Sequence, residues 1–206
     1  LCNNLIRKFR SGASSVIILR RSVDARKKSH VVWRYRIAAD LRDDEAAAEN
    51  LAVYAPEPCA DIPCVKRSKR IIVAGAGPAG LFAALRLIDH GFDVTILERG
   101  FEIRKRDSDV ALLKRKGVLD PESNILFGEG GAGTYSDGKL TTRTNRPEQD
   151  WFFRTLDRFG ADSSILYDAK PHVGTDSLSS VVTAMRAELV SRGAEVLFGE
   201  RIISLI

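Results

Sequence analysis

Three glycines separate a short apolar run from an amphipathic segment, and this arrangement constrains the fold more than any other feature of the chain. Residues 71–74 have the composition of a buried strand, and residues 81–90 have the apolar spacing of a helix. Gly75, Gly77 and Gly80 lie between them with the spacing GxGxxG. A strand that passes through a glycine turn directly into a helix predicts an α/β fold built on a parallel sheet.

The same turn predicts a site for a nucleotide diphosphate. Gly75 permits a sharp turn, Gly77 lets the backbone approach a phosphate without a Cβ in the way, and Gly80 lets the helix pack closely on the strand. The helix directs free N–H groups and the positive end of its dipole at that space. Pro78 suits the first helical turn, where its missing N–H costs nothing.

Residues 94–97 form a second apolar run, and Glu98 follows at its end. An acidic side chain after the second strand can accept hydrogen bonds from a ribose diol. The turn, the helix and this carboxylate together predict that the chain binds a dinucleotide. FAD and NAD modules share this physics, so the turn alone leaves both cofactors open.

A second glycine-rich segment, residues 127–140 (FGEGGAGTYSDGKL), is predicted to reach the same cofactor. Five glycines lie between Gly128 and Gly138, and backbone N–H groups in such a segment can approach a ring or a phosphate closely. The alternative is a mobile loop without a ligand. The predicted contacts are Gly130, Gly131, Gly133, Thr134 and Ser136, with Asp137 and Lys139 as further polar groups.

The chain ahead of the glycine turn predicts a small basic domain and a linker. Residues 1–10 predict a short helix, and residues 15–19 and 31–38 predict strands, which makes residues 1–50 a small α+β domain. Residues 51–69 are punctuated by prolines and predict a linker.

Residues 70–206 are predicted to form the nucleotide-binding domain. Further elements expected there are helices at residues 151–159 and 176–192 and strands at residues 194–198 and 202–206.

The positive charge of the chain is regional. Residues 1–70 hold 15 Lys and Arg against 8 Asp and Glu, and the remainder holds 17 against 19. The densest run, residues 20–28 (RRSVDARKK), is where nucleic acid or an anionic membrane would bind. It lacks the interleaved aromatic side chains that stack on bases. We therefore expect a solvated face or a surface for an acidic partner rather than a nucleic-acid site.

The motif IIVAGAGPAGLFAALRLIDHGFDVTILERG, residues 71–100, resembles the N-terminal motif of FAD-dependent oxidoreductases with the glutathione-reductase-like fold. The resemblance implies a Rossmann-like, three-layer FAD/NAD(P)-binding fold. The residues that it implies at the pyrophosphate are Gly75, Gly77, Ala79 and Gly80, and those at the adenosine are Glu98 and Arg99.

Longer segments are similar to a family of uncharacterised NAD(P)/FAD-dependent dehydrogenase-like proteins of bacteria and plastid-bearing organisms. The segments are RRSVDARKK, LDPESNILFGEGGAGTYSDGKLTTR and KPHVGTDSL. This resemblance implies an FAD-dependent oxidoreductase, with NAD(P)H to be considered as its electron donor, and a fragment that lacks the C-terminal part. The alternatives are an NAD(P)-binding Rossmann dehydrogenase, and a flavin-containing binding module whose basic N-terminal unit engages nucleic acid or an acidic partner.

Two further groups of residues have side chains that could take part in flavin or thiol redox chemistry. His172, in KPHVGTD, is a candidate contact to flavin or substrate, and a structural loop histidine is an equally good interpretation. Cys59 and Cys64 have the C-x4-C spacing of the redox disulfide in pyridine-nucleotide disulfide reductases, but they precede the first strand instead of following the ribose glutamate. We therefore expect ordinary linker cysteines. The spacing of Cys, His and carboxylates predicts no metal site.

Composition bears on the compartment. The longest uncharged stretch after residue 70 is residues 71–85, too short and too rich in glycine for a membrane span. Three cysteines are too few for a disulfide scaffold and favour a reducing compartment. We expect a soluble, cytoplasmic protein. The chain begins at Leu1, so we also expect its true N-terminus to be missing, and a transit peptide ahead of Leu1 would instead place it in the plastid stroma.

Overall fold

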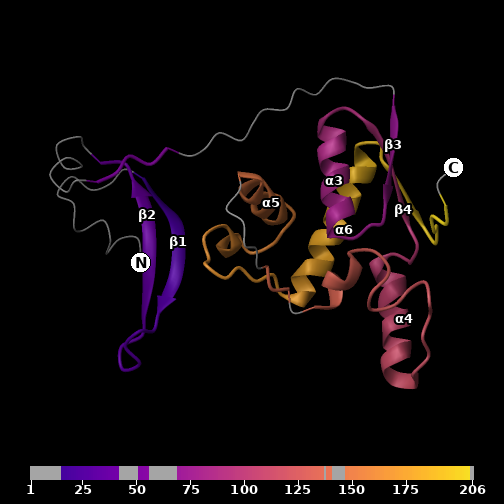
Figure 1. Cartoon of the computed structure of the whole chain (residues 1–206), viewed down its shortest axis with the longest axis horizontal. Coiled ribbons are helices and arrows are strands. Elements are labelled where there is room, and N and C mark those ends of the chain that lie inside the picture. Colours follow the sequence, from indigo (N-terminus) through magenta and orange to yellow (C-terminus); the bar gives the residue numbers. More distant parts are fainter. Residues whose placement is uncertain (1–14, 42–50, 56–68, 137, 141–146, 205–206) are drawn as a thin grey trace. The chain divides into compact units, whose positions relative to one another are not determined.

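The computed structural model divides the chain into two compact units, which are described separately (Figure 1). The N-terminal unit comprises residues 1–59 and 163–171, and the main unit comprises residues 60–162 and 172–206. The residues that the structure describes are 15–41, 51–55, 69–136, 138–140 and 147–204. The predicted helix at residues 1–10 and most of the predicted linker lie outside them, so the predicted domain boundaries stay predictions.

The N-terminal unit is built on an antiparallel hairpin. Strand β1 (Val16–Asp24) pairs with strand β2 (Val32–Ala39), and the register shifts between Ile18 and Arg20. Both predicted strands are confirmed. The expected end of the first strand was wrong, because β1 continues to Asp24. The charged side chains of Arg21 and Asp24 in this extension are accommodated by ion pairs with Asp168 and Arg26.

A distant segment adds backbone pairing to β1. The N–H of Arg21 donates to the carbonyl of Tyr167 at 2.7 Å, and the N–H of Ala169 donates to the carbonyl of Arg21 at 2.9 Å. The guanidinium of Arg21 also makes a two-pronged ion pair with Asp168 and lies 5.2 Å from the ring centres of both Trp33 and Tyr167. These hydrogen bonds to Asp168 raise the pKa of Arg21 above its usual value.

We expect Arg21→Lys to loosen this attachment, because a lysine ammonium cannot donate to both carboxylate oxygens in the same planar geometry. Amide hydrogen exchange at Ala169 should become faster than in the unsubstituted chain. Arg34→Lys is the control, since Arg34 is exposed on the neighbouring strand. Equal exchange rates at Ala169 in all three proteins would mean that the backbone pairing alone holds the segment.

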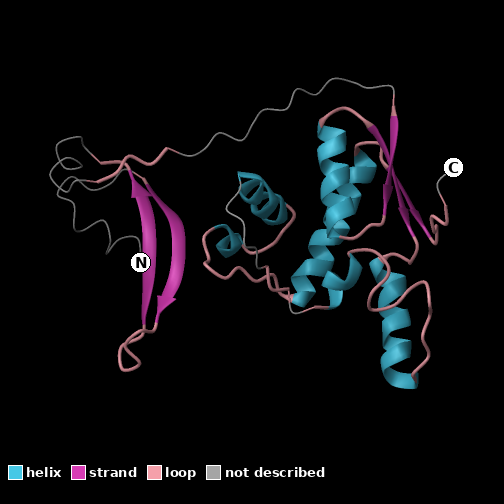
Figure 2. Ribbon diagram, in the orientation of Figure 1, coloured by secondary structure: helices cyan, strands magenta, loops and turns pink. Residues whose placement is uncertain are grey.

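The main unit is a parallel sheet covered by helices (Figure 2). Its three strands lie in the order β3 (Arg70–Ala74), β4 (Asp93–Glu98) and β5 (Glu195–Phe198), all parallel. Helix α3 (Pro78–Asp89) connects β3 to β4, and helix α6 (Thr175–Ser191) precedes β5. The predicted α/β architecture with a parallel sheet is confirmed, and so are the three strands and the two helices expected at these places.

The connection between β4 and β5 carries the remaining elements. They are helix α4 (Ile103–Lys116), the 3-10 turn η1 (Gly131–Tyr135), helix α5 (Pro147–Arg158) and the 3-10 turn η2 (Ser163–Leu166), which belongs to the N-terminal unit. Helix α5 confirms the expected helix near residues 151–159. Helix α4 was not predicted, because its sequence is mostly charged and only a narrow stripe of it is buried.

The core of the main unit lies between the sheet and the helix pair α3 and α6. It consists of buried apolar side chains from three elements: Leu81, Ala84, Leu85 and Ile88 of α3, Val94 and Ile96 of β4, and Val181, Val182, Met185 and Leu189 of α6. Burying a large apolar side chain stabilises a fold by about 1.5–3 kcal/mol. This core therefore holds the amino end of α3 at the edge of the sheet.

The last strand expected from the sequence is not present in the described residues. The strand expected at residues 202–206 was wrong, because residues 201–204 are not in a strand and Ile203 is 87% exposed. Ile202 and Ile203 are both exposed and are not part of the sheet. In the part of the chain that the structure describes, no helix has both the length and the apolar character needed to cross a membrane.

Candidate nucleotide-binding site

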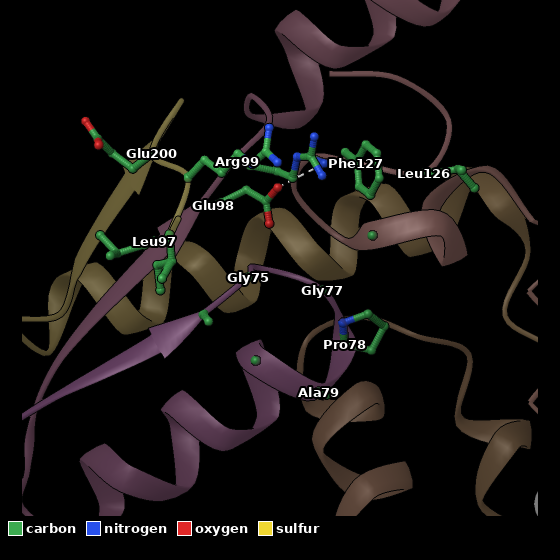
Figure 3. Close-up of a pocket in the computed structure, with 16 residues that line it drawn as sticks. Gly75, Gly77, Pro78, Ala79, Leu97, Glu98, Arg99, Leu126, Phe127 and Glu200 are labelled. Atoms are coloured by element: carbon green, nitrogen blue, oxygen red, sulfur yellow. Dashed lines mark hydrogen bonds between the residues drawn. The ribbon is translucent and has the colours of Figure 1, made fainter. Parts of the chain in front are cut away.

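A cavity of about 470 Å³ opens at the carboxyl ends of β3 and β4 (Figure 3). This is the edge of a parallel sheet where α/β proteins place their ligands. The residues that line it are Ala74, Gly75, Gly77, Pro78, Ala79, Gly80, Leu97, Glu98, Arg99, Leu126, Phe127, Gly128, Gly131, Glu200, Arg201 and Ile202.

The glycine turn delivers the amino end of α3 to this cavity. Gly75 has a φ of +92°, which an L side chain rarely adopts, and its N–H donates to the carbonyl of Leu97 at 2.8 Å. The chain then enters α3 at Pro78, and the first turn of the helix contains no acidic side chain. The N–H groups of a first helical turn have no partner within the helix. The N–H groups of Ala79 and Gly80 therefore form a positively polarised helix end that suits an anion.

Gly80 is where the helix and the strand come closest. A Cβ atom at this position would lie 2.0 Å from the carbonyl oxygen of Gly75 and 3.3 Å from Cγ1 of Val73. Both Gly75 and Val73 belong to the chain that forms β3 and its turn. Gly80 is thus required by packing, while Gly77, with no atom nearer than 3.9 Å to an added Cβ, keeps the space beside the helix end open.

Glu98 braces the wall of the cavity from a buried position. Its side chain accepts hydrogen bonds from three backbone N–H groups: Ala76 at 2.7 Å, Gly100 at 2.9 Å and Gly128 at 3.1 Å. The residue is 5% exposed. A carboxylate has about four acceptor positions, so one remains for a ligand. Glu98 therefore ties the glycine turn to the second glycine segment and still borders the cavity.

The second glycine segment docks against the first. The N–H of Gly130 donates to the carbonyl of Ala76 at 2.8 Å. A Cβ on Gly131 would lie 3.4 Å from Cα of Gly77 and 3.4 Å from Cδ of Pro78. Of the five contacts predicted in this segment, Gly131 lines the cavity.

The other predicted contacts of this segment do not line the cavity. Thr134 is buried and donates to the carbonyl of Glu129, and Ser136 donates to the carbonyl of Gly133. Both hydroxyl groups therefore bond to backbone in or next to the turn η1, which begins after Gly130 in the left-handed conformation. A role for Gly130, Gly133, Thr134 and Ser136 at the cofactor stays a prediction. Asp137 lies outside the described residues.

His172 is not part of this cavity. It is exposed and forms an isolated antiparallel bridge with Lys139, next to the hydrogen bond from the N–H of Val173 to the carbonyl of Gly138. Cys59 and Cys64 lie outside the described residues. Within the described ranges, no group of three His, Cys, Asp or Glu side chains could hold a metal ion.

A flat cationic and aromatic wall completes the cavity. The guanidinium of Arg99 lies 3.8 Å from the ring centre of Phe127 and makes an ion pair with Glu122 at 2.8 Å. Arg201 makes a second ion pair with Glu122 at 3.2 Å. Arginine held over an aromatic face is a stable arrangement against which a planar ligand can stack.

Sequence reasoning missed part of the lining of this cavity. The residues that it did not single out are Leu126, Phe127, Glu200, Arg201 and Ile202. A signal was present for the last three, because they follow the predicted strand at residues 194–198, and the carboxyl ends of parallel strands meet at one edge of a sheet.

The donor set fits FAD. The helix end presents N–H groups of the kind that bind a pyrophosphate, Gly77 and Gly131 leave room beside it, and the carboxylate of Glu98 and the Arg99–Phe127 pair border the same space. All of these groups border one cavity.

Comparison with known proteins points to the same cofactor. Residues 70–112 match the family model described as FAD binding domain. An uncharacterized protein of Clostridium beijerinckii is 36% identical over 196 residues, which are 92% of this chain and 37% of that protein. The chloroplastic zeaxanthin epoxidase of Spinacia oleracea is 35% identical over 81 residues, which are 39% of this chain and 11% of that protein.

Among solved structures, the chain is similar to CabE, an aromatic hydroxylase from angucycline biosynthesis, with 24% identity over 62% of this chain and 23% of that chain. The TM-score is 0.25, which is too low to equate the two folds. This chain spans little more than a third of the length of the Clostridium relative. The family match covers β3, the glycine turn, α3 and β4, and it confirms the prediction of a flavoprotein at the level of this FAD-binding segment.

Proposed function

We propose that this chain is the FAD-binding part of an FAD-dependent oxidoreductase, and that the cavity at the edge of the sheet holds the ADP half of the cofactor. One observation carries the proposal: the open amino end of α3, the carboxylate of Glu98 and the glycine pair Gly77 and Gly131 all meet at one cavity. The match of residues 70–112 to an FAD-binding family model supports it independently.

Each part of the cavity has a distinct task in this proposal. The N–H groups of Ala79 and Gly80, with the dipole of α3, bind the pyrophosphate. The remaining acceptor position of Glu98 takes a ribose hydroxyl. Arg99 and Phe127 hold the adenine by stacking. When bound, FAD supplies the transfer of a hydride or of single electrons, while the protein supplies binding and orientation.

NAD(P)H is proposed as the electron donor, and the substrate is left open. The name of the Spinacia relative states an epoxidase, but that similarity covers 39% of this chain and 11% of that protein. It therefore supports a shared FAD-binding segment and does not identify a substrate for this chain.

Gly77→Val separates binding from folding. Gly77 has an extended conformation that valine adopts readily, with φ −73° and ψ −179°, and an added Cβ meets nothing within 3.9 Å. We therefore expect a melting temperature close to that of the unsubstituted chain. The side chain would fill the space beside the helix end, and we expect FAD affinity to fall at least about tenfold, roughly 1.4 kcal/mol. Flavin fluorescence titration measures the affinity.

The matched control for this test is Gly174→Val. Gly174 is also an extended glycine at the amino end of a helix, and an added Cβ there meets no atom within 4 Å, but it does not line the cavity. FAD affinity should be unchanged in this variant. If Gly77→Val binds FAD as tightly as the control, the cofactor does not lie against α3.

The NAD alternative is tested on the same three proteins. Titration with NADH in place of FAD should show weaker binding to the unsubstituted chain. Tight binding of NADH together with no binding of FAD would replace the present proposal with an NAD-dependent dehydrogenase.

A further inference from the structure

Arg106 is an arginine with no exposed surface, and it is the largest fully buried side chain among the described residues. It lies on α4, and its guanidinium donates to backbone carbonyls rather than to a carboxylate. The hydrogen bonds run to Asn124 at 2.8 Å, Ile125 at 2.9 Å, Glu129 at 2.6 Å and Gly128 at 3.3 Å. A guanidinium has five donors in a rigid fork, so this loop is wrapped around one side chain that satisfies four of its carbonyls.

The two residues between these anchors are part of the cavity wall. Leu126 and Phe127 line the cavity, and Arg106 holds the two carbonyls before them and the two after them. The side chain of Asn124 adds local support by accepting from the N–H groups of Leu126 at 2.9 Å and Phe127 at 3.3 Å. The Leu126–Phe127 part of the wall is therefore held at both ends by a side chain that does not itself line the cavity.

The contacts of Arg106 also reach Glu98 through a single residue, Gly128. Gly128 donates its N–H to the Glu98 carboxylate, while its carbonyl accepts from Arg106. A Cβ on Gly128 would lie 2.5 Å from Cδ of Arg106, so the backbone of the loop packs directly against the arginine side chain. A single residue, Gly128, thus connects the carboxylate of Glu98 to the guanidinium of Arg106 by hydrogen bonds.

Placing an arginine here has a cost that the surroundings offset. Burial lowers the pKa of Arg106, while Tyr135 and the carboxylates of Glu98 and Glu129 act in the opposite direction. The ring of Tyr135 lies 4.7 Å from the guanidinium. A buried charge is tolerated when its hydrogen bonds are satisfied. An apolar side chain of similar size would fill the same space without this cost, but it would leave four loop carbonyls without donors.

We propose that Arg106 is a positioning residue of the nucleotide site. It fixes the part of the cavity wall formed by Leu126 and Phe127 and, through Gly128, the carboxylate of Glu98, without contacting the nucleotide itself. This inference rests on the function proposed above for the cavity. It differs from a general structural role because it concerns the half of the cavity that would hold adenosine and not the helix end that would hold the pyrophosphate.

The two halves can be probed separately with ADP and with inorganic pyrophosphate. Arg106→Lys keeps the charge and much of the aliphatic stem, but one ammonium cannot reach carbonyls at both ends of the wall. We expect the Kd for ADP to rise about tenfold or more, because a site held loosely by its supporting residues loses affinity. The Kd for pyrophosphate should change by less than about twofold, since α3 is held by the core. Isothermal titration calorimetry measures the first and NMR titration the second.

Arg104→Lys is the matched control. Arg104 lies two residues earlier on α4 and is exposed, so both affinities should remain those of the unsubstituted chain. An equal loss of ADP and pyrophosphate binding in Arg106→Lys would overturn the inference in favour of a general structural role. No loss of ADP binding would overturn it as well, while leaving the proposed function in place. An unsubstituted chain that binds neither FAD nor ADP would overturn the proposed function and this inference together.

A second measurement needs no variant and applies even if Arg106→Lys does not fold. If Arg106 holds the wall in place before a ligand arrives, the amides of Phe127 and Gly128 should be protected from hydrogen exchange in the free protein. ADP should then add little protection there. Amides that exchange freely until ADP binds would show that the wall forms around the ligand, and the inference would be wrong.

Discussion

Gly80→Ala is expected to destabilise the main unit and to lower its affinity for FAD at least about 100-fold. Alanine in place of glycine inside a helix ordinarily stabilises a protein by about 0.5–1 kcal/mol. Here the added Cβ would lie 2.0 Å from the carbonyl oxygen of Gly75, a backbone atom held by the hydrogen bond of its own residue to Leu97. Overpacking of this kind costs about 1–3 kcal/mol, so the tertiary contact reverses the sign of the propensity.

The same contact should also weaken the binding of FAD. Relief of the contact requires α3 to move away from β3, and this moves the N–H groups of Ala79 and Gly80 from the pyrophosphate position. We expect FAD affinity to fall by at least about 100-fold, roughly 2.7 kcal/mol. Urea denaturation followed by circular dichroism measures the stability, and flavin fluorescence measures the binding.

Gly133→Ala is the control for this prediction. Gly133 lies in the second glycine segment, does not have a positive φ, and would place a Cβ 4.0 Å from Cγ of Pro78, which is ordinary contact. We expect its stability to stay within about 0.5 kcal/mol of that of the unsubstituted chain. A Gly80→Ala protein as stable as this control would mean that the turn relaxes without moving the helix.

Glu98→Gln should lower both stability and FAD affinity, in contrast to Gly77→Val, which should lower affinity alone. The carboxylate accepts three backbone N–H groups. Glutamine offers one acceptor oxygen, and its NH₂ group would face a buried N–H. Leaving a buried donor without an acceptor costs about 1–3 kcal/mol. The lost charge-assisted bond to a ribose should weaken FAD binding by a further 1–3 kcal/mol or so, on the order of 10-fold to 100-fold.

Glu195→Gln is the matched control for Glu98→Gln. Glu195 lies on β5, with a half-exposed side chain that makes one hydrogen bond with Thr95 and a long ion pair with Arg70. Its replacement should change neither FAD affinity nor stability by more than about 0.5 kcal/mol. If Glu98→Gln loses stability but keeps its affinity for FAD, the carboxylate is a brace of the fold and the ribose is held elsewhere.

The part of the site that sequence reasoning located is the part that local chemistry specifies. The strand before Gly75, the helix that begins at Pro78 and the acidic residue at the end of β4 are each indicated by residues only a few positions away. Their spacing predicted a nucleotide site, and the structure places all of them on one cavity. Positive φ at Gly75 and the close approach at Gly80 are the physical reasons that glycine occurs at these two positions.

The part that sequence reasoning missed depends on contacts between distant residues. A run of charged residues such as IRKRDSDVALLKRK indicates an exposed segment, because charged side chains are rarely buried, yet it forms α4 and carries the buried Arg106. The pairing of β1 with residues 167–169 joins positions about 147 apart in the chain. Neither feature has a local signal.

The sequence by itself determined the strand, glycine turn, helix and strand between Arg70 and Glu98, and with them a dinucleotide-binding segment, because hydrophobic period, backbone freedom and turn spacing act over short distances. Only the tertiary structure decided that Gly131 lines the cavity while Thr134 and Ser136 do not, and that the side chain of Glu98 accepts hydrogen bonds from three backbone N–H groups. The reason is that each of these outcomes depends on which backbone donors and acceptors meet after the chain has folded, and a linear pattern does not encode those distances.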